Sequence, residues 1–112
     1  MLERIKEALR GAGISAYDPG IKIGECKQSY AVVRSLGVEP LPQSKGLLGR
    51  RSYEALLVVP MAQQSTLPAM TASIKEALAP LPLRLSSVTD QDLQDAFRAA
   101  GCSLIYTQNL RL

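Results

Sequence analysis

The sequence predicts an α+β fold, a single small domain in which two main helices pack on one face of a mixed or antiparallel β-sheet. Its 112 residues suit one domain, and an apolar share of 46% can supply a modest core. Segments with helical spacing stand between segments with strand character. The strongest strand becomes apolar on both faces in its second half, which is typical of a central strand. We therefore expect a two-layer domain whose other sheet face and edges remain available for partners.

The chain opens with a pattern typical of a short amphipathic helix, in which the charged residues, Lys6 among them, avoid the apolar stripe. Gly11 and Gly13 are expected to end this helix. A brief strand over 14–17 and a turn at Asp18-Pro19-Gly20 follow, because proline and glycine favour the backbone angles of a turn. The apolar stripe recurs at steps of three and four residues: Leu2, Ile5, Leu9 and Ala12.

The middle of the chain predicts two strands joined by a long connection. Tyr30 to Leu36 is rich in β-branched and aromatic residues. Gly37 to Arg50 follows as a connection, since its prolines and glycines oppose regular structure. Arg51 to Val59 is the best strand in the chain, and Pro60 is expected to end it. One face of this strand carries alternate apolar residues: Tyr53, Ala55, Leu57 and Val59.

A second helix is predicted after the best strand. Ser65 and Thr66 can cap its start, Pro68 is tolerated in its first turn, and Pro80 closes it. The alternation from Leu81 to Leu85 then suggests an edge strand. The apolar stripe of the second helix consists of Leu67, Met70, Ile74 and Leu78.

The last quarter of the chain is open to two interpretations. Residues 89–92 fit a capping box, and a helical spacing follows up to Gly101 as terminator. This helix would contain Leu93, Ala96, Phe97 and Ala100. A strand over the same residues is the alternative. Cys102 to Leu110 then predicts a terminal strand with Leu104 and Tyr106 on one face.

Composition argues against an enzyme and against a membrane protein. Histidine is absent, which removes the commonest general acid or base and a common metal ligand. Thirteen basic and ten acidic residues leave a net charge of +3, too mild to identify a nucleic-acid binder. The charged, amphipathic start is unlike a secretory signal, and the longest apolar run, Ala55 to Met61, is far shorter than the ~20 residues of a spanning helix. We expect a soluble protein made in a cytoplasm.

The two cysteines, Cys26 and Cys102, lie far apart in the sequence. In a reducing compartment we expect free thiols that pack as small apolar groups; a single disulfide is the alternative, but nothing in the spacing requires it. A zinc site would need further ligands, and the chain has no histidine to provide them.

A basic segment is the main candidate for contact with a partner. The connection and its flanks carry Arg34, Lys45, Arg50 and Arg51 against Glu39 alone. Long loops are usually functional or disordered, so we expect an arm that grips an acidic surface or a phosphate backbone. A solvated hairpin is the alternative. The glycine spacing excludes a phosphate-binding P-loop, and a Gly-x-x-Gly clamp for RNA fits poorly.

A short acidic segment contains Asp90, Asp92 and Asp95. These carboxylates can act in acid/base chemistry or hold Mg²⁺, or they can stabilise a helix N-terminus. A third interpretation pairs this acidic segment with the basic segment of another copy. Such head-to-tail contacts close into rings when the rotation permits. The tyrosines, Tyr30, Tyr53 and Tyr106 among them, are expected in the core or at interfaces rather than in a stacking platform.

The layout resembles the small neck proteins of long-tailed bacteriophages and prophages, known as minor capsid, head–tail joining or tail completion proteins and similar to tail terminators. The resemblance runs over nearly the whole chain and has no single signature motif. It is carried by the amphipathic opening, Ala12 to Gly20, Cys26 before Tyr30 to Val33, the long loop, Ser52 to Pro60, Ile74 to Pro80, Phe97-Arg-Ala and Ile105-Tyr106.

The resemblance implies an α+β subunit of the virion neck that assembles in the host cytoplasm as a ring, commonly a hexamer. Such a ring caps the tail tube protein and joins the head–tail connector protein, while DNA only passes through the lumen. The resemblance implies no catalytic residues, cofactors or metals, and it implies a strand-like final segment. The alternative function is a small nucleic-acid-binding regulator that uses residues 37–51. A third class, a small enzyme, would use the Asp90–Asp95 carboxylates.

Overall fold

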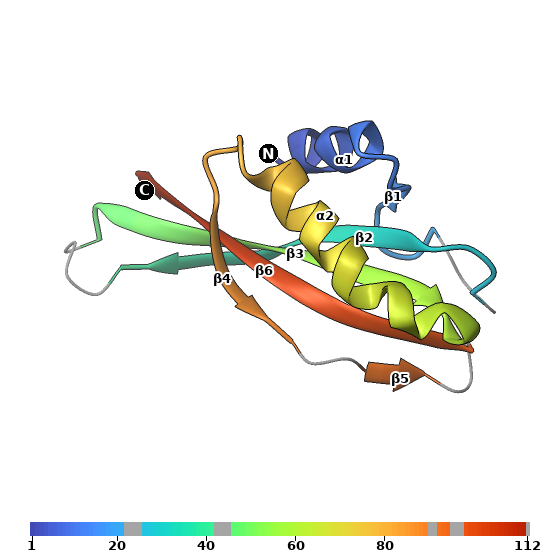
Figure 1. The fold of residues 1–112 in the computed structure, drawn as a ribbon. Helices are drawn as coiled ribbons and strands as arrows, with labels where there is room; N and C mark the ends of the chain where they lie inside the picture. The colour runs from blue at the N-terminus through green and yellow to red at the C-terminus, as the bar shows by residue number, and fades with distance from the viewer. Residues whose placement is uncertain (22–25, 42–45, 90–91, 95–97, 112) are drawn as a thin grey trace.

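An α+β architecture is present, as the sequence predicts: two α-helices lie against one face of a twisted β-sheet (Figure 1). The computed structural model describes residues 1–21, 26–41, 46–89, 92–94 and 98–111. Its elements are α1 (Leu2–Gly11), β1 (Ala16–Tyr17), β2 (Tyr30–Pro40), β3 (Leu48–Pro60), a 3₁₀ turn (Met61–Thr66), α2 (Leu67–Leu78), β4 (Arg84–Val88), β5 (Asp92–Gln94) and β6 (Ala99–Arg111).

The sheet is mixed. Its strands follow the order β1-β2-β3-β6-β4, and β5 also pairs with β6. The short pairing of β1 with β2 is parallel, and the other described pairings are antiparallel. β3 and β6, each of 13 residues, pair along their full lengths and form the centre of the sheet.

One hydrophobic core joins both helices to the same sheet face. The predicted inward face of β3 is confirmed, since alternate residues from Tyr53 to Val59 are buried. The predicted pair on the last strand, Leu104 and Tyr106, is buried beside them. Both helices contribute to this cluster, which confirms that they cover one face: Ile5 and Leu9 come from α1, and Leu67, Ile74 and Leu78 come from α2.

The local signals at the two helices and the first turn are mostly confirmed. The backbone N–H of Ile21 donates to the carbonyl of Asp18 at 3.4 Å, and Gly20 takes a φ of 84° within this turn. Thr66 stands at the N-cap of α2 as predicted. Its hydroxyl, however, donates to the carbonyl of Gln63 rather than capping the helix. Lys6 lies outside the hydrophobic cluster, as predicted, although its side chain is buried.

The predicted connection from 37 to 50 is much shorter than expected, because most of it is paired strand. β2 continues to Pro40 and β3 begins at Leu48. A bulge between Ser35 and Gly37 absorbs the glycine, whose φ of 107° would oppose a regular strand. The N–H of Leu41 donates to the carbonyl of Leu48 at 3.0 Å, so the backbone of Leu41 faces β3. The backbone of the preceding residue, Pro40, therefore faces the outer edge of β2. No ladder bond is lost there, and proline is tolerated.

The helical interpretation of the last quarter is wrong for the described residues. Residues 92–94 form β5, which pairs with Ala99 to Gly101 at the start of β6. Residues 90–91 and 95–97 lie outside the described part of the chain. Gly101 is no helix terminator, since a Cβ there would lie 2.7 Å from the carbonyl oxygen of Leu57. The edge strand is also displaced from its predicted place, to Arg84–Val88.

Cys26 and Cys102 are free and buried, as expected. Burial raises the pKa of the Cys26 thiol above its ordinary value. The sulfur of Cys102 lies 3.3 Å from the Thr71 hydroxyl, across the α2–β6 contact. Among the described residues, no helix has the length and apolar character needed to cross a membrane.

Gly101→Ala is expected to lower the free energy of unfolding by about 1–3 kcal/mol, because the added methyl group meets backbone that cannot move aside freely. Urea denaturation measures the change. Gly11→Ala is the matched control: nothing lies within 4 Å of its added methyl group, so it should be neutral or slightly stabilising. Equal stability of the Gly101 variant and the natural protein would contradict the close approach.

Candidate assembly surface

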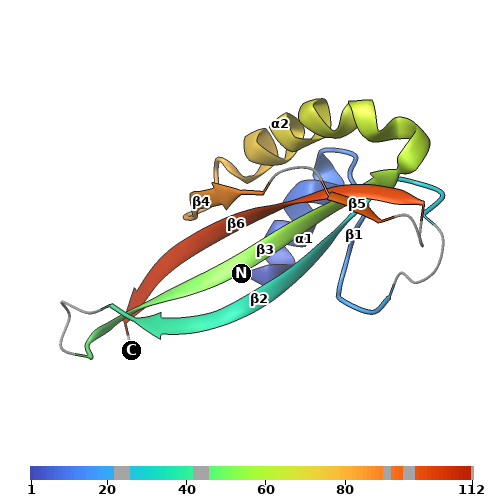
Figure 2. The same ribbon diagram turned by 90° about the horizontal axis from the view of Figure 1, so that it is seen from below.

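The distal segments of β2, β3 and β6 project beyond the helices as a three-stranded ribbon (Figure 2). We define the arm as residues 36–40, 48–52 and 107–111. β2 is alternately buried only up to Val33, and all its later residues are exposed. Large apolar side chains are exposed on the arm and at its turn: Leu36 (43%), Val38 (38%), Leu47 (68%) and Leu48 (43%). Exposed apolar residues gathered in this way are typical of contact surfaces.

The two predicted arginines of the arm lie on opposite faces of the sheet. Successive strand residues point to opposite sides. Arg51 is two residues from the buried Tyr53 and therefore lies on the side of the helices, although it is exposed. Arg50 lies on the other side, opposite Glu39 and Asn109 in the neighbouring strands. The arm therefore presents positive charge on both faces.

Arg34 is not a free charge of the basic segment. Its Nε atom donates to Oε1 of Glu54 at 2.7 Å on the face away from the helices. The Glu54 side chain is 13% exposed and Arg34 is 52% exposed, so the pair lies at the surface. Lys45 lies outside the described residues. The predicted basic set thus leaves Arg50 and Arg51 as its described, solvent-facing members.

The acidic segment is only partly described. Asp92 begins β5 at the edge of the sheet, whereas Asp90 and Asp95 lie outside the described residues. A contact between the acidic and basic segments of two copies therefore stays a prediction. The core role of Tyr53 and Tyr106 is confirmed, and Tyr30 packs edge-on against Tyr17 with ring centroids 5.9 Å apart.

Free strand edges border the described sheet on both sides. β1 pairs with β2 only at Ala31 and Val32, so the edge of β2 from 34 to 40 has no described strand beside it. β4 borders the sheet on the other side, and all five of its residues are exposed. Free backbone groups at such edges can pair with another chain.

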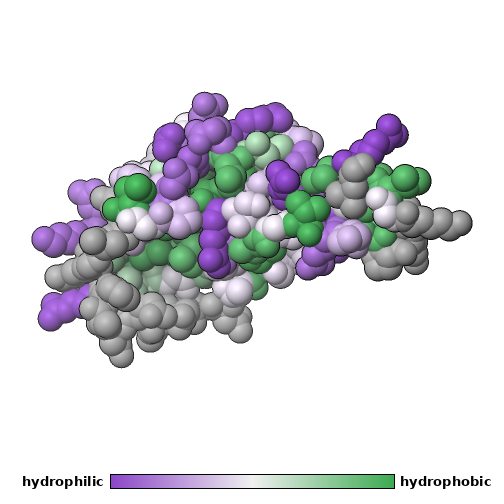
Figure 3. Space-filling view, turned by 180° about the vertical axis from the view of Figure 1, so that it is seen from behind, coloured by the Kyte–Doolittle hydropathy of each residue, from purple (hydrophilic) through white to green (hydrophobic). Residues whose placement is uncertain are grey.

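The sheet face without helices is mixed in character. Figure 3 views the molecule from the side opposite to that of Figure 1, and apolar side chains there lie among hydrophilic ones. Half-buried apolar residues alternate along the central strands with the inward-facing core residues: Val32, Leu56, Val58 and Ile105. This distribution confirms the expectation that β3 becomes apolar on both faces.

An open groove lies where the segment leading into β4 diverges from the distal part of β6. It encloses about 540 Å³ and is lined by Leu81 to Ser86, Thr107 to Asn109 and Arg50. The sequence does not identify Arg84 as a site residue. Only the pairing of Arg84 with Thr107 brings it near Arg50, so no local signal in the sequence indicates this neighbourhood.

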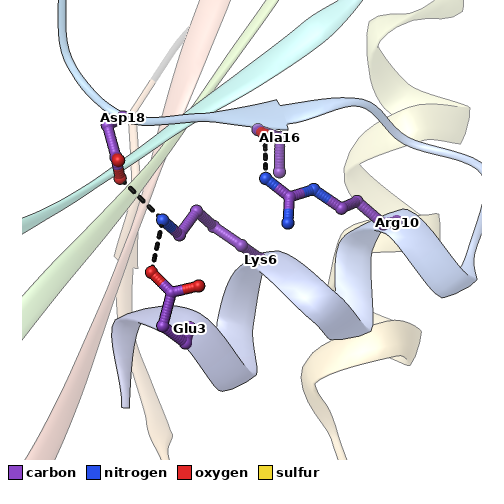
Figure 4. A network of polar contacts seen from close by, with 5 residues as sticks. All are labelled: Glu3, Lys6, Arg10, Ala16 and Asp18. Carbon is purple, nitrogen blue, oxygen red and sulfur yellow. Dashed lines mark hydrogen bonds and ion pairs between the residues drawn. The ribbon is translucent and has the colours of Figure 1, made fainter.

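A separate polar cluster joins α1 to the turn after β1 (Figure 4). The Lys6 ammonium lies 2.8 Å from Oδ1 of Asp18 and 2.6 Å from Oε1 of Glu3. Hydrogen bonds to Asp18 and Glu3 raise the pKa of Lys6 above its ordinary value of 10.5, and the bond to Asp18 has the larger effect. The Arg10 guanidinium donates to the carbonyl of Ala16 at 2.9 Å. These contacts stabilise the position of α1, and none of their residues belongs to the arm.

Neither protein-family models nor curated proteins match this sequence. In the described part of the chain, no three His, Cys, Asp or Glu side chains lie close enough together to hold a metal ion.

Asp18→Asn is expected to lower the free energy of unfolding at pH 7, because it removes the charge that faces the Lys6 ammonium. The folded-state pKa of Lys6 is raised, so its contribution is complete below pH 10.5 and is lost as the pH rises through the folded pKa. Urea denaturation at pH 7 and pH 11 should therefore show a smaller difference between the two proteins at pH 11. Glu7→Gln controls for the change in net charge, and a difference that is equal at both pH values would contradict this role of Lys6.

Proposed function

We propose that this protein is a structural subunit of a bacteriophage or prophage neck, a tail terminator or head–tail joining protein that acts as a ring. The observation that carries the proposal is the arm. It is an ordered ribbon outside the core with exposed apolar side chains and arginines. Arginine and large apolar residues are common at protein interfaces, and a preformed ribbon loses little conformational entropy on binding.

The free edges support contacts between copies. The edge of β2 and the edge of β4 lie on opposite sides of the sheet and differ in length and composition. Contacts between unlike surfaces are heterologous, and heterologous contacts close into a ring when the rotation permits. In this proposal the partners are further copies of the chain, the tail tube protein and the head–tail connector protein, and DNA passes through the lumen.

The positive charge on both faces of the arm supports the insertion of the arm between two partners. Arg51 faces one side and Arg50 faces the other, so each can meet a different acidic surface. We assign one of these contacts to the neighbouring copy, where the segment with Asp90, Asp92 and Asp95 is acidic, and the other to the tail tube. Complementary charges of this kind fix register and partner choice.

A nucleic-acid-binding regulator is the second candidate, because the arm and the groove together carry several arginines. A nucleic-acid backbone lies along one surface of its protein, whereas Arg51 faces the side opposite to Arg50 and Arg84, and Arg34 is neutralised by Glu54. This geometry favours protein partners. The two functions also differ in salt dependence, since phosphate contacts weaken steeply as the salt concentration rises.

The assignment is tested by charge reversal on the arm. The double variant Arg50→Glu/Arg51→Glu should remain folded, because both side chains are exposed, and should reduce tail capping at least about tenfold through like-charge repulsion. Purified protein is mixed with uncapped tail tubes, and capped ends are counted in negative-stain images. Lys75→Glu, an exposed position on α2, is the matched control and should cap normally.

Normal capping by the double variant would overturn the role of the arm. Tight binding of duplex DNA at physiological salt, lost in the same variant, would replace the neck assignment with the regulator.

A further inference from the structure

β6 extends past the start of β4 and leaves a free stretch of strand edge (Figure 1). The pairing of β4 with β6 begins at Arg84 and Thr107, so no described strand lies beside residues 108–111 on that side. On the other side, β3 holds the same residues in extended form through the pairs from Gln108–Arg51 to Arg111–Leu48. The groove described above lies against this free edge.

The hydrogen bonds between the β4 segment and β6 show which backbone groups of β6 point toward the free edge. The N–H of Thr89 donates to the carbonyl of Ser103 at 2.9 Å, which shows that Ser103 faces outward. Backbone groups of alternate strand residues point the same way. Asn109 and Arg111 therefore direct their N–H and carbonyl groups outward, where a further strand can pair with them.

The two sides of the groove differ in chemistry. Arg84 pairs with Thr107 and therefore lies on the face away from the helices, as Arg50 does. Leu85 pairs with Tyr106 and lies on the side of the helices. Neither arginine forms an ion pair with a described residue, and no acidic side chain in the described part of the chain lines the groove.

We propose that this groove binds an extended acidic segment of a partner protein, which adds to β6 as a strand beside residues 108–111. Alternate residues of the added strand fall on the two faces. Its acidic side chains then meet Arg84 and Arg50, and its apolar side chains lie on the side of Leu85. Backbone hydrogen bonds supply the affinity, and the alternation of acidic and apolar side chains supplies the specificity, as in other strand additions. The inference deepens the proposed function, on which it rests, by naming the kind of segment that an assembly partner inserts.

The free edge favours a peptide over a nucleic acid, because outward N–H and carbonyl groups of a strand match another polypeptide backbone. Leu85, on the side of the helices, offers no polar contact to a phosphate backbone. Duplex DNA is therefore the competing occupant that the experiment includes.

The first test is fluorescence anisotropy with a labelled heptapeptide of alternating Glu and Val. A peptide of the same composition with its Glu residues grouped before its Val residues is the matched probe. The alternating peptide should bind the full chain at least about tenfold more tightly, because only it separates charge and apolar groups onto two faces. Equal binding of the two peptides would overturn strand addition and leave attraction by charge alone.

Two variants separate the charge from the backbone. Arg84→Glu should weaken binding of the alternating peptide about tenfold by like-charge repulsion, and Lys75→Glu should leave it unchanged. Asn109→Pro removes an outward N–H while keeping the bonds of Gln108 and Leu110 to β3, and should weaken binding with the fold retained in circular dichroism. If Arg84→Glu and Lys75→Glu have equal effects, the proposal is wrong.

A 20-base-pair DNA duplex is the third probe. Binding of the duplex in the same salt range, with displacement of the peptide, would assign the groove to nucleic acid and overturn the proposal. Peptide binding is measured on the free protein and tail capping on the assembled tube. Failure of one leaves the other measurable, so the inference and the proposed function can fail separately.

Discussion

The unbroken pairing of β3 with β6 organises both the core and the arm. Each strand has 13 residues, and every residue of one is paired with a residue of the other. In the proximal half, Leu57 and Leu104 are fully buried beneath the helices, and Gly101 lets the two backbones approach closely. The same ladder continues into the arm, where no helix covers it. The core therefore fixes the direction of the arm, which emerges as an extension of the sheet rather than as a separate hairpin.

The sequence predicts the parts of this fold that depend on local periodicity. Alternation from Tyr53 to Val59 and the spacing from Leu67 to Leu78 each define one buried face, and the structure confirms both. The sequence predicts a connection over residues 37–50 because Gly37 and Pro40 signal breaks, yet a bulge accommodates Gly37 and an outward-facing edge position accommodates Pro40. Residues 92–94 belong to a segment with helical spacing but pair with the nearby start of β6, so strand pairing overrides a weak local preference.

The candidate surface likewise depends on strand pairing that local sequence patterns do not reveal. Sequence identifies Arg50 and Arg51 as exposed charges, but only the register reveals that they face opposite sides. It groups Arg34 with them, although Glu54, twenty residues away, neutralises it. It misses Arg84, which the pairing of β4 brings to the groove. Charges that act together on this molecule come from different strands. Their grouping follows from strand register, which a single sequence specifies only through the buried face.

In this account the arm is a stably paired ribbon in which β6 keeps a free backbone edge at residues 108–111. Amide hydrogen exchange of the isolated protein, followed residue by residue by NMR, measures this pairing. The amides of Gln108 and Leu110, which face β3, should exchange at least about tenfold more slowly than those of Asn109 and Arg111, which face outward. Fast and equal exchange at all four residues would mean that the arm opens freely in solution, and would contradict a preformed surface for assembly.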